Sequence, residues 1–366
     1  MTSKARQLAD LGGDTANLED ISSAYSSGAL SNRSKIINGA MTIDQRNAGA
    51  AVSADGYTLD RWVAFENTSA TSVTAQKSTT APAGFTNSLL YTVGTGGSAG
   101  ASEQAIIRQR LEGNNVSDLA FGTASAQNIT VSFCVRSSVI GTYSVAIQNS
   151  AGDRAYVATY TVDVADTWET KSIIILGDTS GTWLTDNGIG MAVLFDLGSG
   201  SGFNTSAGAW VAGDFRNVSG QANVIGTSGA TFYLTGVQLE AGDTATPFEH
   251  RSYGAELALC QRYYEEWQGG AGDMVGPVGQ AFDSSSGETA LLFMVEKRAA
   301  PTISTSGSFQ VWLGAGIAGI GSIGFAETRT KQSTWQYGGA GAGSVGQAIQ
   351  FFSSEGTSKV MISAEL

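Results

Sequence analysis

Proline, cysteine and charged side chains are all scarce in this 366-residue chain. It contains 4 prolines and 2 cysteines, and 14% of its residues are charged, whereas glycine contributes 48. The net charge is −12, and no Lys/Arg cluster is present that would gather phosphate contacts on one surface, so a nucleic-acid partner is not expected. This composition is typical of an all-β protein with a neutral surface rather than a helical or disordered one.

Long apolar runs are missing as well. The first residues, MTSKARQLADLGGD, lack the apolar core of a signal peptide, and no stretch approaches the length of a membrane helix. Membrane insertion is therefore not expected. Cys134 and Cys260 lie far apart and do not have metal-ligand spacing, which favours two free thiols over a disulfide and assembly in a reducing cytosol.

The first region, residues 1–35, is Ser/Gly-rich and predicts at most a short helix near Ala16–Ser22. Two interpretations stay open for it: a floppy leader, or an attachment peptide that becomes ordered only against a partner.

Residues 36–252 alternate between apolar and polar side chains in many short segments, as strands do when one face is buried. A single unit with eight or more such strands predicts an antiparallel two-sheet sandwich of jelly-roll type. The expected strands are Ile129–Val135, Tyr143–Ile147, Arg154–Val162, Trp168–Leu176, Ile189–Phe195 and Phe232–Leu239. In addition, the sequence Asp186-Asn187-Gly188 predicts a tight hairpin that leads from Trp183–Thr185 into Ile189–Phe195.

The stretch from Phe232 to Tyr253 closes this sandwich. Its apolar positions shift by one residue at Gly236, which predicts a β-bulge and leaves Gln238 and Glu240 on the wetter face. Thr246-Pro247 then predicts an extended exit from the domain, because the residue before proline avoids the helical region.

The last region, residues 253–366, predicts one or two helical turns over Tyr253–Cys260, then a strand, then a smaller β domain. Further strands are expected at Leu291–Val295, Phe309–Leu313, Ile349–Phe352 and Val360–Ile362. Glycine-rich linkers separate these strands, so we expect a small hydrophobic core. Self-association would bury the apolar surface that the monomer leaves exposed.

Catalytic and cofactor motifs are weak. Gly314–Gly319 and Gly341–Gly346 match the dinucleotide pattern GxGxxG, but the glycines after the first match would not support the helix that the pattern needs. His250 is the only histidine, and a lone histidine in a chain of this composition is usually a packed or surface residue, so a catalytic triad and enzymatic activity are not expected. Asp60, Glu240 and Asp243 offer oxygen ligands for Ca²⁺, yet capping of turns is the favoured interpretation, and no cofactor is predicted.

Glycan binding is more plausible than catalysis, because aromatic rings can stack on sugars while amides and carboxylates meet the hydroxyl groups. Core packing is the competing interpretation for each ring. Four aromatic residues of the last region are the candidate ligand contacts: Trp267, Trp312, Trp335 and Tyr337.

Several short motifs occur in an order that resembles tail-fibre-type structural proteins of tailed phages, above all those of marine and cyanobacterial viruses. They are Ser22–Arg33, Ile36–Asn47, Gly56–Trp62, Val237–Glu249 (VQLEAGDTATPFE), Cys260–Tyr264, Lys297–Thr302 and Ser363–Leu366.

The resemblance implies a virion protein, made in the host bacterial cytoplasm, that forms a homotrimer. Its N-terminal peptide would dock on tail or capsid proteins, with Leu18, Ile21 and Tyr25 as the attachment residues. Its sandwich would be carbohydrate-binding-module-like, and its C-terminal domain would meet a glycan or protein of the host surface. A short tail fibre acting by adhesion is the first expectation. A tail adaptor or a capsid decoration (head fibre) is the alternative, and a glycan depolymerase is a more distant one.

Overall fold

Nearly all regular structure in the described residues is β-strand. The computed structural model describes residues 32–70, 72–314, 316–339 and 344–366. Within them lie 23 strands, two α-helices and two short 3₁₀ turns. The contacts between residues divide the chain into two units. The first comprises the residues up to Met41, Ser53–Asp55 and Ala64–His250, and the second comprises Thr42–Val52, Gly56–Val63 and Arg251–Leu366.

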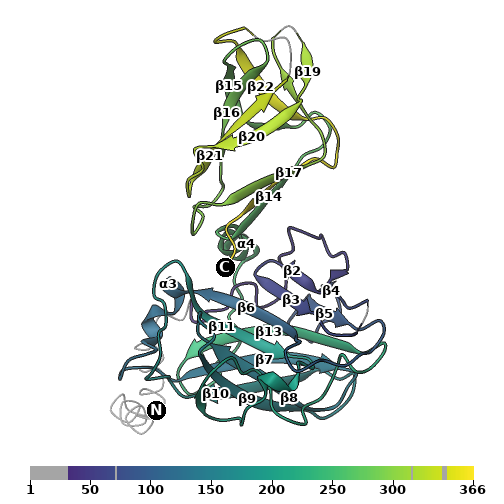
Figure 1. The fold of residues 1–366 in the computed structure, drawn as a ribbon, viewed down its shortest axis with the longest axis vertical. Helices are drawn as coiled ribbons and strands as arrows, with labels where there is room; N and C mark the ends of the chain where they lie inside the picture. The colour runs from purple at the N-terminus through teal and green to yellow at the C-terminus, as the bar shows by residue number, and fades with distance from the viewer. Residues whose placement is uncertain (1–31, 71, 315, 340–343) are drawn as a thin grey trace, which may run out of the picture. The chain divides into compact units, whose positions relative to one another are not determined.

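The first unit is an antiparallel β-sandwich, which confirms the predicted all-β, jelly-roll fold class (Figure 1). One sheet has the order β1-β4-β5-β13-β7-β10, with strands Val52–Ser53, Thr74–Ser78, Ser88–Thr92, Thr231–Ala241, Ile129–Ser137 and Glu169–Ile175. The other has the order β12-β9-β8-β11-β6-β3-β2, with strands Trp210–Ala212, Arg154–Val162, Gly141–Gln148, Ile189–Asp196, Ala105–Glu112, Trp62–Glu66 and Asp55–Leu59. Most of β2 and the first two residues of β3 are among the residues assigned to the second unit. Short helical segments connect strands of this unit: α3 (Gly113–Val116), η1 (Ser117–Leu119) and η2 (Ser201–Phe203).

Aromatic rings from both sheets meet in the core between them. Phe133 of β7 packs against Phe195 of β11 and Tyr160 of β9, with ring centroids 5.0 and 4.9 Å apart. Phe133 and Phe195 are at most 1% exposed. Since successive side chains of a strand alternate between faces, the neighbours of these core residues lie on the outer faces of the sheets.

Strand β13 carries the predicted bulge. Its register with β7 shifts between Thr235 and Gln238, and Gly236 adopts φ +62°. A side chain at Gly236 would be strained by that backbone angle, and its Cβ would lie 2.6 Å from Cζ of Phe85. Phe232 and Leu239, on either side of the bulge, are both fully buried, so the bulge keeps the apolar positions on the core face.

The segment that precedes β11 differs from the sequence-based expectation. Trp183–Thr185 is not a strand, and Asn187-Gly188 does not form the predicted hairpin, because neither residue adopts positive φ. Instead the carboxylate of Asp186 accepts a hydrogen bond from the Gly188 amide at 2.8 Å. Strand β11 pairs with β6 and β8, which are distant in sequence.

The second unit contains helix α4 (Tyr253–Gln261) followed by a strand, as predicted. A three-stranded sheet has the order β14-β23-β17, with strands Tyr264–Gln268, Lys359–Ser363 and Thr302–Ser306. A seven-stranded sheet has the order β19-β18-β22-β15-β16-β21-β20, with strands Ile317–Gly319, Phe309–Trp312, Ala348–Ser353, Met274–Ala281, Ser286–Leu292, Gln332–Gly338 and Ser322–Ala326.

Segments 42–52 and 56–63 fall in the second unit, although the sequence places them within the expected sandwich range of 36–252. A charged cluster within this unit explains their position. Arg46 forms ion pairs with Asp60 and Glu365 at 3.4 and 3.0 Å, and the guanidinium of Arg61 also pairs with Glu365. Arg46 in addition stacks on Tyr264, 3.5 Å from the ring centroid.

Among the described residues, no helix is long and apolar enough to cross a membrane. Cys134 and Cys260 are both free thiols.

Candidate functional site

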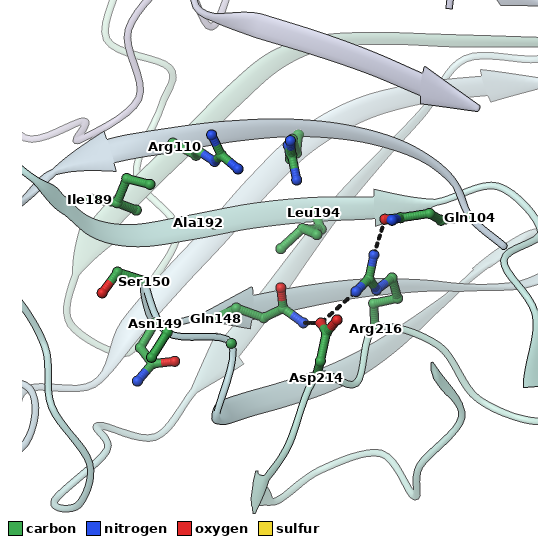
Figure 2. A pocket seen from close by; sticks show the side chains of 13 residues that line it. Gln104, Arg110, Gln148, Asn149, Ser150, Ile189, Ala192, Leu194, Asp214 and Arg216 are labelled. Carbon is green, nitrogen blue, oxygen red and sulfur yellow. Dashed lines mark hydrogen bonds and ion pairs between the residues drawn. The ribbon is translucent and has the colours of Figure 1, made fainter. Parts of the chain in front are cut away.

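A polar pocket lies on the outer face of the seven-stranded sheet of the sandwich. We call it the outer-face pocket (Figure 2). Its volume is about 210 Å³. Strands β6, β8 and β11, the β8–β9 turn and the segment after β12 supply its lining: Gln104, Arg108, Arg110, Gln148, Asn149, Ser150, Ala151, Gly152, Ile189, Ala192, Leu194, Asp214 and Arg216.

Strand pairing sets the floor of the pocket. Ala192 of β11 lies opposite Arg110 of β6 on one side and opposite Gln148 of β8 on the other. The next outward position, Leu194, lies opposite Arg108. Because Ala192 has a small side chain between two long polar ones, the sheet face is hollow at this point.

Hydrogen bonds hold one wall of the pocket in place. Asp214 accepts from Nε2 of Gln148 at 2.8 Å and also from the guanidinium of Arg216. Arg216 donates in addition to Oε1 of Gln104 and stacks on Phe203 at 3.8 Å from the ring centroid. Figure 2 shows Gln148, Asp214, Arg216 and Gln104 as a connected row beside Ala192 and Leu194. The wall is therefore preorganised, which lowers the entropic cost of binding a ligand.

The turn between β8 and β9 forms another part of the rim. Oδ1 of Asn149 accepts from the amides of Asp153 and Arg154, each at 3.2 Å, and Nδ2 of Asn149 donates to Oδ1 of Asp153 at 2.6 Å. Gly152 adopts φ +66°, which this turn requires. Ser150 and Ala151 are thus presented on a fixed loop.

The chemistry of the lining suits binding rather than bond cleavage. Its hydrogen-bonding side chains are three arginines, three amides, one serine and a single carboxylate, Asp214. Glycoside hydrolysis generally needs two carboxyl groups, and nucleophilic catalysis needs an activated nucleophile beside a base. Elsewhere in the described part of the chain, no group of three or more His, Cys, Asp or Glu side chains is arranged to hold a metal ion.

The aromatic residues predicted to contact a ligand lie in the second unit, in different environments. Trp335 is fully buried among Phe309, Phe325 and Phe351, and Tyr337 is 3% exposed. As core residues, neither offers a ring face to a sugar.

The other two predicted rings are more accessible. Trp267 is half-buried and packs against the same core, whereas Trp312 is 42% exposed. The predicted attachment residues Leu18, Ile21 and Tyr25 lie outside the described residues.

The residues of the Val237–Glu249 motif have structural partners. Gln238 and Glu240 do not lie on a wet face as predicted: they are 0% and 2% exposed. Glu240 accepts from the amide and hydroxyl of Thr246 at 2.8 and 2.7 Å, and Gln238 accepts from the amide of Glu249 at 2.9 Å. Both side chains therefore fasten the extended exit segment to the sheet.

The remaining candidates also have local partners. Asp243 accepts from Asn128 at 2.7 Å, and Asp60 accepts from Nε2 of Gln45 at 2.6 Å. His250 is exposed and lies near Phe248 and Phe85, with ring centroids 4.9 and 5.4 Å away.

A second hollow, of about 490 Å³, lies on the other sheet of the sandwich. Phe85 and Phe248 line it, together with Ser132, Thr170 and other small residues. It has one charged lining residue, Lys171, and no amide side chain. The outer-face pocket offers many more directional hydrogen-bond donors, so we take it as the candidate binding site.

Arg108 and Arg110 were missed at the level of sequence, although a signal is present. The segment Ala105–Glu112 reads AIIRQRLE, and alternation in a strand would have placed both arginines on one face. The contributions of Gln148, Asp214 and Arg216 depend on long-range pairing and leave no local signal.

No protein-family model and no curated protein sequence matches the chain. Among solved structures, it is similar to the enzymatically active domain of tailspike protein 4 from bacteriophage CBA120, at 12% identity and a TM-score of 0.33, over 57% of this chain and 22% of that one. It therefore spans about a fifth of the tailspike chain.

Other similar structures are carbohydrate-binding modules. A family 11 module from a Clostridium thermocellum cellulosomal cellulase matches at 13% identity and a TM-score of 0.28, over 56% of this chain and 100% of the module. The xylan-binding CBM22-1 domain from Paenibacillus barcinonensis Xyn10C matches at 13% identity and a TM-score of 0.25, over 55% and 99% of the two chains. We base the functional proposal on the pocket residues themselves.

Proposed function

We propose that this protein is a glycan-binding adhesion protein of a tailed-phage particle, a short homotrimeric tail fibre that binds host-surface glycan without cleaving it. The observation that carries the proposal is the outer-face pocket. It presents guanidinium, amide and hydroxyl groups in fixed positions around a small floor residue, Ala192. Sugars are recognised by such convergent hydrogen-bonding groups.

The virion assignment is supported by the order of the sequence motifs that resemble tail-fibre-type proteins. The structure gives one of these motifs a physical role, because Glu249 at the end of Val237–Glu249 accepts hydrogen bonds from the amides of Asn32 and Ser34. The last residues of the proposed attachment region, 1–35, are thus hydrogen-bonded to the end of this motif.

The test of glycan binding is a screen of the full-length protein against immobilised bacterial and algal polysaccharides. We expect retention on at least one polysaccharide, with no release of reducing ends during prolonged incubation. Retention on none would overturn the adhesion proposal, and release of reducing ends would favour a depolymerase instead.

The position of the protein on the phage particle and its oligomeric state need separate measurements. Gold-labelled antibody viewed by electron microscopy should mark the tail of virions, whereas label on the head would identify a capsid decoration. Size-exclusion chromatography with light scattering should give the mass of three chains, and a stable monomer would contradict the trimer.

A further inference from the structure

We propose that the first unit binds a calcium ion at the end of β11, through the carboxylate of Asp196 and the side-chain amide oxygens of Asn217 and Gln221. The site shares no residue with the lining of the outer-face pocket. The inference therefore goes beyond the proposed glycan-binding function and does not depend on it.

Three buried oxygens in this region have no hydrogen-bond donor. Among the residues that the structure describes, the buried carboxylate and amide oxygens without a hydrogen-bond partner are Oδ2 of Asp196, Oδ1 of Asn217 and Oε1 of Gln221. Asp196 is 0% exposed and Asn217 is 1% exposed. Buried polar atoms in folded proteins normally have a partner, which can be an ordered water or an ion. Because all three oxygens belong to one region, they indicate a common partner.

Hydrogen bonds connect these side chains to one another. Nε2 of Gln221 donates to Oδ1 of Asp196, and the amides of Gly198 and Ser199 donate to the same oxygen, each at 2.9 Å. Nδ2 of Asn217 donates to the carbonyl of Ser199 at 2.9 Å. Each side chain is thus held through one of its polar atoms, which also fixes which amide atom is the oxygen. The unpartnered oxygens are therefore preorganised.

Ser144 supplies a fourth oxygen. It lies opposite Asp196 in the pairing of β8 with β11, and residues directly opposite each other have their side chains on the same face of a sheet. Within the described residues, Oγ of Ser144 is buried and has no hydrogen-bond partner, so it does not reach Oδ2 of Asp196. A bound ion between the two would contact both. Asn217 and Gln221 also line a hollow of about 160 Å³, which provides an entry path.

The charge of Asp196 also calls for a cation. Burial raises the pKa of Asp196, against the effect of hydrogen bonds from Ser199, Gly198 and Gln221. Among the described residues, Asp196 has no Lys or Arg as an ion-pair partner. Buried carboxylates are usually paired with a cationic side chain or coordinate a metal ion. A cation beside Oδ2 would supply the missing positive charge.

The donor set suits calcium. Ca²⁺ takes roughly six to eight oxygen ligands from carboxylates, amides, carbonyls and water in a flexible geometry, whereas Mg²⁺ demands a near-ideal octahedron and loses its water reluctantly. Here one carboxylate, two amide oxygens and one hydroxyl are available, and water would complete the shell. Because the ligands carry a single charge, binding should be weak, with a Kd on the order of 10⁻⁴–10⁻³ M.

The experiment compares thermal unfolding of the full-length protein in excess chelator and in calcium at about tenfold to a hundredfold above that Kd. We expect calcium to raise the unfolding temperature of the first unit by about 3–10 °C. Magnesium at the same concentration should raise it less. Isothermal titration calorimetry should give one calcium ion per chain.

Variants locate the ion. Asp196→Asn keeps the size of the side chain but removes its charge, so the shift caused by calcium should be lost. Gln221→Glu adds a second carboxylate beside Asp196, which should lower the unfolding temperature in chelator and make the shift caused by calcium larger than in the natural protein. The control Asp166→Asn removes the same charge from an exposed side chain of the first unit and should leave the shift unchanged.

Each other outcome would overturn the proposal. Equal unfolding temperatures in calcium and in chelator, with no heat of binding, would show that ordered water satisfies these oxygens. An unchanged shift in Asp196→Asn would place the calcium elsewhere. If Asp196→Asn does not fold, Gln221→Glu decides, and a shift no larger than that of the natural protein would contradict the site. A shift of the same size with magnesium would overturn the assignment to calcium.

Discussion

The backbone amide of Ser34 donates a hydrogen bond to Oε2 of Glu249 at 2.9 Å, across 215 positions of sequence. The other carboxylate oxygen accepts from the amide of Asn32. Since Glu249 itself donates its amide to the buried Gln238, the start of the described chain is connected to the core strand β13 through one side chain. The segment Thr246–Glu249 therefore holds residues 32–34 against the sandwich through hydrogen bonds, and we call this contact the N-terminal clasp.

Replacing Glu249 by Ala should loosen this clasp. Two backbone amides lose their acceptor, and a hydrogen bond to a charged group contributes about 1.5–3 kcal/mol. We expect a loss of about 2–4 kcal/mol in the free energy of unfolding, and faster proteolytic cleavage near residues 32–35. Glu327→Gln is the control, because Glu327 is exposed and forms an ion pair with the equally exposed Arg329. Unchanged proteolysis in Glu249→Ala would contradict the clasp.

Gly236→Ala tests the bulge in β13. The substituted residue would have to keep φ +62° and displace the ring of Phe85, which packs on Phe248 at 5.0 Å. Non-glycine residues in this conformation cost about 1–3 kcal/mol, and we expect a loss of that size in chemical denaturation. Gly254→Ala, near the start of α4 where nothing lies within 4 Å of the added Cβ, should not be destabilising. Similar chemical-denaturation curves for Gly236→Ala and Gly254→Ala would show that the bulge does not need glycine.

Asp60 should make the stability of the second unit depend on pH. Burial raises the pKa of Asp60 to about 6 from 3.8, against the opposing effects of Gln45 and Arg46. The folded state therefore binds this proton more tightly than the unfolded chain does, so stability falls as pH rises from about 4 to about 6, by about 3 kcal/mol.

Asp60→Asn removes that titration, so its stability relative to the natural protein should increase across the same pH range and then level off. Denaturant unfolding at several pH values measures the difference. A difference that stays constant between pH 4 and 7 would contradict the assignment.

Local patterns in the sequence predicted most of the sandwich. The alternation in Ile129–Val135 and the phase shift at Gly236 are both found in β7 and β13, because burial of one sheet face imposes a period of two. The hairpin predicted from Asn187-Gly188 does not form. The segment before it packs through Trp183 on Phe121 and Trp210 instead of forming a partner strand. A turn signal predicts a hairpin only if both flanking segments become strands.

Less of the candidate site than of the fold could be predicted from the sequence. Trp335 and Tyr337 were candidates for stacking because aromatic residues serve both cores and sugar sites, and only packing distinguishes the two roles. Gln238 and Glu240 were expected on a wet face, since polar residues usually lie there, but the exit segment covers them. The outer-face pocket joins β6 to the segment after β12, about a hundred residues apart, so no local pattern specifies it.

Filling the floor of the outer-face pocket is the most direct test of the central claim that the protein binds glycan there. Ala192→Leu adds a branched side chain between Arg110 and Gln148, at a residue that lines the pocket, and the unfolding temperature checks that the sheet stays folded while the hollow is lost. The measurement is the affinity of both proteins for the polysaccharide that the natural protein binds best. Binding should fall by about tenfold or more, the effect of losing one charge-assisted contact, with the unfolding temperature preserved. Equal affinity of the two folded proteins would show that the glycan binds elsewhere.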